Sequence, residues 1–179
     1  ATDASTHVAI AAWSWPSYFS PEKILEGIRL TTSKWVRPAP NSAPTDSKAA
    51  GLYMICSLSK HDAEREGFDD ALMLDYRGFI AEATGANIFF IKDKKLYTPI
   101  PDCFLNGITR QTVIDIAKKM NIDVEENHYK PEFLKDCEEV FLTGTAVEIT
   151  PVNSIDNLFF NVGETTKLLI DEFNKTVNS

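Results

Sequence analysis

The sequence has few cysteines and histidines, no long apolar run and no excess of basic residues. Its three cysteines, Cys56, Cys103 and Cys137, are odd in number, far apart and free of any C-x-x-C spacing. This argues against a disulfide framework and against a zinc site, and it is typical of reduced thiols in a cytoplasmic protein. The three histidines are scattered as well, so the sequence predicts no metal site.

The charge and hydropathy of the chain exclude further classes of partner. A formal net charge of −8 argues against nucleic acid or an anionic membrane as the main partner. No apolar stretch approaches the roughly 20 residues that a membrane-spanning helix needs. Residues 1–5 lack the basic start and apolar core of a signal peptide. The 179 residues, of which 44% are hydrophobic and 25% charged, fit one large globular domain.

Predicted strands and helices alternate irregularly along the chain. Apolar runs predict strands at 7–13, 28–36, 122–125 and, broken at Gly144, 139–152, and two hairpins at 71–82 and 87–98. Helical spacing or capping signals predict helices at 21–27, 49–66, 109–120, 130–137 and 164–177. No repeat or linker divides this pattern, which indicates one mixed-sheet α/β domain.

The stretch from Leu105 to Thr109 is the most suggestive local feature. Gly107 allows a tight turn, and Thr109 stands where the N-cap of the following helix is expected. Such a turn leaves several amide groups unpaired at the positive end of the helix dipole, where an anion such as phosphate binds well. On this stretch alone, an ordinary capped helix after a loop is the simpler interpretation.

Two charged residues and one turn are the other candidates for chemistry. Lys48 stands between a proline-rich segment and a helix start, with small neighbours, and a desolvated lysine can form a Schiff base with a carbonyl. Glu82 ends an apolar strand, where a buried carboxylate needs a cationic partner. Taken singly, a solvated lysine and a solvated strand-end glutamate are the simpler interpretations. The turn at 143–146 is either a plain tight turn or a set of donors for anions.

Together these segments resemble the large domain of the fold-type IV, or class IV, pyridoxal-phosphate enzymes, most closely the branched-chain amino-acid aminotransferases. The resemblance covers nearly the whole chain. Four segments in the family's order and spacing carry it: PTDSKAAGLY at 44–53, EATGANIF at 82–89, LNGITR at 105–110 and TGTAVEITPV at 143–152. The resemblance implies a mixed-sheet pseudo-barrel surrounded by helices.

The resemblance also implies a role for each candidate residue. Lys48 would be the catalytic Schiff-base lysine, Tyr53 would hydrogen-bond the phenolate oxygen of pyridoxal 5'-phosphate, and Glu82 would pair with its ring nitrogen. Leu105 would pack on the cofactor ring. The phosphate would be bound after Gly107 by the amides of Ile108 and Thr109 and by the side chain of Thr145. The Thr145–Ala146 turn would bind the carboxylate of the substrate.

The function implied is transamination of leucine, isoleucine or valine with 2-oxoglutarate by a cytoplasmic homodimer or higher homo-oligomer. The glycine-x-tyrosine pattern ending at Tyr53 favours this branch over D-amino-acid aminotransferases and aminodeoxychorismate lyases, which stay alternatives, as does a non-catalytic truncated domain. The sequence departs from the family pattern at Leu52, Ala83, Ala86 and Asn106. We expect residues 1–179 to be the cofactor-binding large domain without the family's smaller N-terminal domain, and to be inactive alone.

Overall fold

The computed structural model describes residues 3–14 and 18–178 of the chain. Its strands are β1 (Ile28–Thr32), β2 (Asp70–Leu74), β3 (Ile80–Ala83), β4 (Asn87–Lys92), β5 (Lys95–Pro99), β6 (Val124–Asn127), β7 (Glu139–Gly144), β8 (Glu148–Ile155) and β9 (Leu158–Phe159). Its helices are α1 (Pro21–Glu26), α2 (Tyr53–Arg65), α3 (Ile108–Lys119) and α4 (Glu164–Val177), with short 3-10 helices η1 (Ala50–Leu52) and η2 (Pro131–Asp136).

Six of the strands close into a barrel. They pair in the order β3-β2-β1-β8-β7-β4, and a pairing between β3 and β4 completes the ring. β1 runs parallel to both β2 and β8, and the other neighbours in the ring are antiparallel. Beyond its contact with β3, β4 also pairs with β5, so β5 and β6 extend the sheet past the ring. The mixed-sheet pseudo-barrel that the resemblance implied is thereby confirmed.

The alternation of side chains along the strands builds two apolar cores. Ile88 and Phe90 of β4 point into one cluster, which draws residues from all six strands of the ring and therefore fills the barrel. Phe89 and Ile91, the intervening residues, belong to a second cluster with apolar residues of α3 and α4. β4 is thus buried on both faces, as its unbroken apolar sequence requires.

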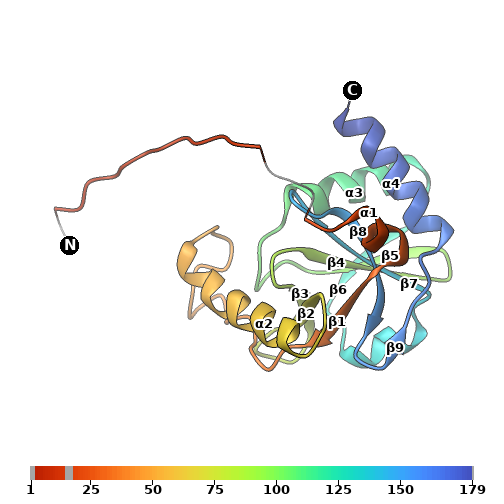
Figure 1. Ribbon diagram of the computed structural model, residues 1–179, viewed down its shortest axis with the longest axis horizontal. Helices are drawn as coiled ribbons and strands as arrows, with labels where there is room; N and C mark the ends of the chain where they lie inside the picture. Colours follow the sequence, from red (N-terminus) through yellow and green to blue (C-terminus); the bar gives the residue numbers. More distant parts are fainter. Residues whose placement is uncertain (1–2, 15–17, 179) are drawn as a thin grey trace.

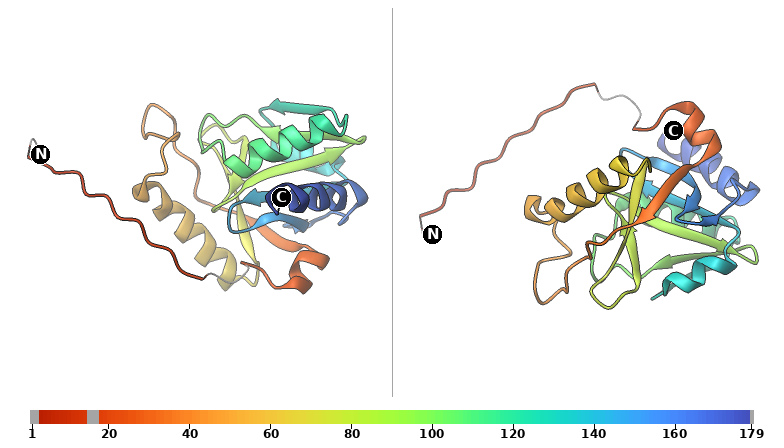
Figure 2. Two further views of the ribbon diagram at one scale, coloured as in Figure 1. Left: turned by 90° about the horizontal axis from the view of Figure 1, so that it is seen from above. Right: turned by 60° about the horizontal axis from the view of Figure 1, so that its bottom comes forward.

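The helices cover opposite sides of the barrel. α3 and α4 lie together over one side, and α2 lies apart from them against β2 (Figures 1 and 2). Residues 3–14 extend away from the body in every view (Figures 1 and 2).

Most of the predicted elements are present. The two hairpins form as β2–β3 and β4–β5, the strand pair meets at Gly144, and the closing helix spans Glu164–Val177. In the first hairpin, Asp75 Oδ1 accepts the amide protons of Arg77 and Phe79 and so holds the turn. In the second, Asp93 and Lys94 both have positive φ angles, as a two-residue hairpin turn demands.

Three expectations were wrong. The predicted strand at 7–13 is not a strand and pairs with none of the strands in the described residues, and its Val8 and Ile10 are 85% and 96% exposed. The strand predicted at 28–36 ends at Thr32. Thr109 is not the N-cap of its helix, because α3 begins at Ile108 and Gly107 is the N-cap, whose carbonyl accepts the amide proton of Gln111. An apolar run predicts a buried strand only if another surface covers it, and a one-residue shift in a helix start leaves its periodicity unchanged.

Candidate functional site

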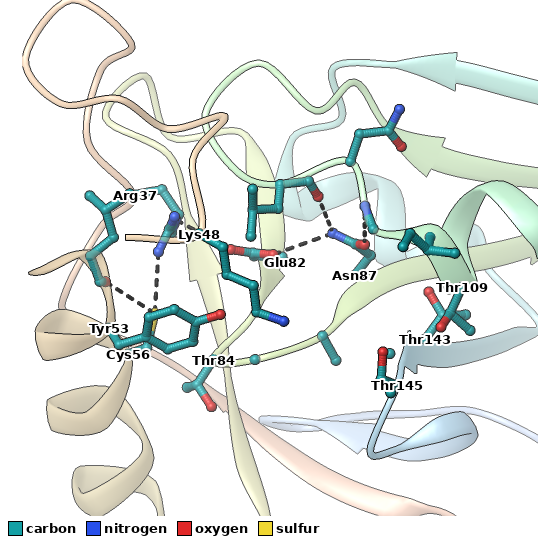
Figure 3. Close-up of a pocket in the computed structure, with 18 of the residues that line it drawn as sticks. Arg37, Lys48, Tyr53, Cys56, Glu82, Thr84, Asn87, Thr109, Thr143 and Thr145 are labelled. Atoms are coloured by element: carbon teal, nitrogen blue, oxygen red, sulfur yellow. Dashed lines mark hydrogen bonds and ion pairs between the residues drawn. The ribbon is translucent and has the colours of Figure 1, made fainter. Parts of the chain in front are cut away.

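A cavity of about 330 Å³ opens at the end of the barrel that lies between the starts of α2 and α3. Figure 3 shows residues from both sides converging on it: Lys48 and Tyr53 on one side, and Thr109, Thr143 and Thr145 on the other. Nearly all the site residues expected from the sequence line this cavity, namely Lys48, Tyr53, Glu82, Leu105, Gly107, Ile108, Thr109 and Thr145. Segments separated by about a hundred residues in the chain therefore meet in one space.

Lys48 and Tyr53 form the wall on the α2 side. Lys48 lies in the loop before η1, and its side chain is exposed rather than desolvated, although it lines the cavity. Tyr53 is the first residue of α2 and is 39% exposed. Partial burial raises the pKa of the Tyr53 hydroxyl, and the charges of Glu82 and Cys56 add to this, while Arg37 opposes it. Tyr53 therefore carries its proton at neutral pH and can donate a hydrogen bond into the cavity.

Glu82 lies at the centre of the site on β3 and is only 8% exposed. Burial raises the pKa of its carboxyl to about 8, even though Arg37 acts in the opposite direction. Arg37 Nε lies 3.3 Å from Glu82 Oε1, and the arginine is itself buried. A second donor, Asn87 Nδ2, lies 3.3 Å from Glu82 Oε2.

Arg37 is the cationic partner that the sequence required but did not identify. Its Nη1 lies 3.2 Å from Cys56 Sγ on α2, and its Nε also donates to the carbonyl of Cys103 at 3.3 Å. These contacts join segments 19 and 66 residues away along the chain. The residues next to Arg37 in the sequence do not predict these contacts. The only signal in the sequence was that a buried carboxylate needs a positively charged neighbour.

The start of α3 forms the opposite wall of the cavity. No side chain caps the helix within the described part of the chain, and its N-cap is a glycine. The Ile108 side chain is 81% exposed, whereas Thr109 is buried. Both residues line the cavity, and they belong to the first turn of α3, where the amide groups lie at the positive end of the helix dipole.

The loop between β7 and β8 completes this wall. Thr145 is exposed and lines the cavity, and Thr143 Oγ1 is buried without a hydrogen-bond partner among the described residues. The sequence marked Thr143 only as part of a turn. Ala146 does not line this cavity but a smaller one of about 150 Å³ between the same loop, α1 and α4. Ala146 is thus the one expected site residue that does not line the main cavity.

These residues fit a flat, anionic, proton-accepting group. A buried carboxyl stands at the centre, a lysine and a tyrosine hydroxyl lie on one side, and a helix start with free amide groups lies on the other. The unpartnered Thr143 hydroxyl adds one buried polar atom that a bound group can satisfy. Such a set can hold a phosphate at one end and a protonated ring nitrogen at the other.

One cluster with metal-ligand chemistry lies in the described ranges 3–14 and 18–178, formed by Asp75, Asp102 and Cys103. Arg77 already occupies it, since Arg77 Nη2 lies 2.7 Å from Asp75 Oδ2 and 2.8 Å from Asp102 Oδ2. We therefore interpret this cluster as an ion-pair network. None of the described helices combines the length and apolar character needed to cross a membrane.

Comparison with known proteins gives consistent matches. A family model described as "Amino-transferase class IV" matches residues 1–155. The chain is 46% identical over 177 residues to a probable branched-chain-amino-acid aminotransferase of Rickettsia bellii, covering 97% of this chain and 60% of that protein. It is 43% identical over 161 residues to the branched-chain-amino-acid aminotransferase of Escherichia coli K12, covering 89% and 52%.

Solved structures agree with these matches. The crystal structure of the Escherichia coli branched-chain amino acid aminotransferase superposes with a TM-score of 0.89 at 39% identity, covering 92% of this chain and 56% of that one. A second branched-chain amino acid aminotransferase, crystallised with pyridoxamine 5'-phosphate, superposes with a TM-score of 0.87 at 37% identity, covering 92% and 55%. The chain spans about half to three fifths of the length of the relatives it matches.

Proposed function

Since the chain belongs to the class IV aminotransferases, we propose that it binds pyridoxal 5'-phosphate and serves the transamination of branched-chain amino acids with 2-oxoglutarate. Residues 1–179 would be the cofactor-binding domain of that enzyme. The similar proteins named above are branched-chain aminotransferases, and one of the solved structures contains pyridoxamine 5'-phosphate. We also propose a cytoplasmic location and a homodimeric or higher homo-oligomeric state, as expected from the sequence.

The observation that carries the proposal is the position of Glu82. Burying a carboxyl costs folding free energy, and buried carboxyls with a raised pKa are found mostly at functional sites. Glu82 lines a cavity that also contains Lys48 and the start of α3. Its pKa of about 8 means that Glu82 holds a proton at neutral pH. That proton is available to a ring nitrogen placed against the carboxyl, which leaves a carboxylate next to a protonated ring and Arg37 close by.

The residues on the two walls have complementary tasks. Lys48 would attach the cofactor covalently and, once substrate has displaced it, move the proton at Cα, a role worth roughly 10²–10⁴-fold. Tyr53 would donate to the phenolate oxygen. Leu105 would pack on the ring face.

The phosphate and substrate contacts would come from the other wall. The amides of Ile108 and Thr109 and the hydroxyl of Thr145 would hold the phosphate, and Gly107 keeps the approach to this helix start free of a side chain. The backbone of the Thr145–Ala146 turn would bind the substrate carboxylate. When bound, the cofactor itself supplies the electron sink that makes the Cα–H bond acidic.

Cofactor binding and turnover test the proposal separately. After removal of free pyridoxal 5'-phosphate, the purified chain should keep a protein-bound visible absorbance band, and Lys48→Ala should abolish that band without lowering the melting temperature. Turnover should be measured with a panel of L-leucine, L-isoleucine, L-valine, D-alanine and aminodeoxychorismate, on this chain and on any longer natural form of the protein.

Each outcome has a clear meaning. Activity confined to the branched L-amino acids would support the proposed substrates. Activity with D-alanine, or with aminodeoxychorismate, would assign the chain to another branch of the same family. Absence of the visible band at millimolar cofactor would indicate a non-catalytic domain.

A further inference from the structure

Asn87 connects the two halves of the cavity, although the sequence suggested no role for it. It is the first residue of β4, is 5% exposed and pairs directly with Glu82 of β3. Its side chain lies between Glu82 and the start of α3 (Figure 3). It therefore touches both the carboxyl and the anion site described above.

Three hydrogen bonds hold the Asn87 amide. Nδ2 donates to Glu82 Oε2 at 3.3 Å and to the carbonyl of Leu105 at 3.0 Å, and Oδ1 accepts the amide proton of Gly107 at 3.2 Å. An amide turned by 180° would place its oxygen against the Leu105 carbonyl and its NH₂ group against the Gly107 N–H donor. The contacts with Leu105 and Gly107 thus determine the orientation of the side chain.

Gly107 is shaped to this contact. A Cβ added at Gly107 would lie 2.4 Å from Asn87 Oδ1, closer than any real contact of that kind. The φ angle of Gly107 is −59°, which any residue can adopt. The glycine is therefore required by the close approach of Asn87 and not by its backbone conformation.

We propose that Asn87 is a positioning residue that fixes the Glu82 carboxyl relative to the turn of Leu105 and Gly107, and so sets the separation between the ring-nitrogen site and the phosphate site. This inference rests on the proposed function. Arg37 forms an ion pair with Oε1 of Glu82, whereas Asn87 donates a hydrogen bond to Oε2 and so fixes the orientation of the carboxyl. Because Asn87 already occupies the Gly107 amide, the next amides, of Ile108 and Thr109, are left for an anion.

The first test uses the unsubstituted chain without cofactor. With ¹³C-labelled glutamate and uniform ¹⁵N labelling, the Glu82 carboxyl, the Asn87 side-chain amide and the Gly107 amide should titrate together in NMR spectra, with one midpoint near the pKa of about 8. Arg37, Tyr53 and Cys56 interact with this carboxyl, and Asp46 and Lys48 line the same cavity. The pKa values of Tyr53 and Cys56 are raised above their ordinary values of 10.0 and 9.0. A midpoint near 8 that is kept in Lys48→Ala and lost in Glu82→Gln therefore belongs to Glu82.

Glu82→Gln supplies the control for that titration. Both amide signals should stop titrating near pH 8 in this variant. If the Gly107 amide does not follow the Glu82 carboxyl in the unsubstituted chain, the coupling is absent and the inference fails, whatever cofactor the protein binds.

The second test compares Asn87→Ala with Asn153→Ala. Asn153 is a matched control, because its Nδ2 also donates hydrogen bonds to two backbone carbonyls, those of Glu26 and Gly27, and none of these residues lines the cavity. Asn87→Ala should speed hydrogen exchange of the Gly107 amide by about tenfold. It should raise the pKa of Glu82, since a donor to the charged form is lost, and weaken pyridoxal 5'-phosphate binding by about tenfold. Asn153→Ala should change none of the three.

The outcomes separate the two proposals. Equal effects of both substitutions on exchange, titration and binding would reduce Asn87 to a purely structural residue and overturn the inference. Cofactor binding that survives in the parent chain but is unaffected by Asn87→Ala would overturn the inference alone. A parent chain that fails to bind the cofactor, while its amides still titrate with Glu82, would instead refute the proposed function.

Discussion

The buried carboxyl of Glu82 makes the stability of the ligand-free chain depend on pH in a predictable direction. Its pKa is raised from 4.5 to about 8 in the folded chain because burial penalises the charged form. The folded state therefore binds one more proton than the unfolded state between these two values. The stability that this proton confers is fully present below about pH 4.5 and is lost as the pH rises through 8.

The magnitude follows from the size of that interval. Each pH unit between about 5 and 8 should lower the free energy of unfolding by about 1.4 kcal/mol, up to a total of about 5 kcal/mol. Glu82→Gln keeps the shape of the side chain and removes the titration. The variant should therefore gain stability over the parent by about 1.4 kcal/mol per pH unit across this range.

Urea unfolding followed by circular dichroism measures this difference directly, at half-unit steps from about pH 5.5 to 8.5 and without cofactor. Glu139→Gln is a matched control, because Glu139 is equally buried but accepts hydrogen bonds from Thr165 and Thr166 at the start of α4. That substitution should destabilise the chain rather than stabilise it at high pH. A difference between Glu82→Gln and the parent that stays constant across this pH range would refute the reasoning about burial.

Further predictions concern close approach, capping and anion binding. Gly107→Ala should cost about 1–3 kcal/mol in thermal unfolding, because its Cβ would overlap Asn87, whereas Gly51→Ala, with no atom within 4 Å, should be neutral or slightly stabilising; equal costs would contradict this. Glu139→Ala should cost about 2 kcal/mol in urea unfolding by removing the acceptor at the start of α4, and a loss near zero would exclude that role. Thr145→Val should weaken pyridoxal 5'-phosphate binding by about tenfold while leaving thermal stability within about 0.5 kcal/mol, since the side chain is exposed; unchanged affinity would remove Thr145 from the phosphate site.

The parts of the fold that depend on local sequence were predictable. β4 and β5 are short apolar runs joined by a polar turn, and in α4 apolar residues recur with the period of a helix. The pattern of apolar residues is therefore enough to locate these elements. The closure of the barrel was not predictable from pattern, because β1 pairs in parallel with β2 and β8, which lie about 40 and 125 residues further along the chain. It came from the resemblance to a known family.

The candidate site shows the same division. Motif segments pointed to Lys48 and Glu82, but the side chains that contact the Glu82 carboxyl are Arg37, which lies outside those segments, and Asn87, which lies in the segment at 82–89 but received no role from the sequence. The error at Thr109 has a similar cause. A hydroxyl residue is the usual N-cap, and only the three-dimensional position of Asn87 explains why a glycine takes that place.

The central claim is that Lys48 carries the cofactor in a site organised around Glu82. The most direct measurement is reduction of the pyridoxal 5'-phosphate complex with borohydride, followed by protease digestion and mass spectrometry of the labelled peptide. We predict a single phosphopyridoxyl label on Lys48, lost in Lys48→Ala and retained in Lys60→Ala. A label on any other lysine, or equal labelling of many lysines, would contradict the assignment of the site.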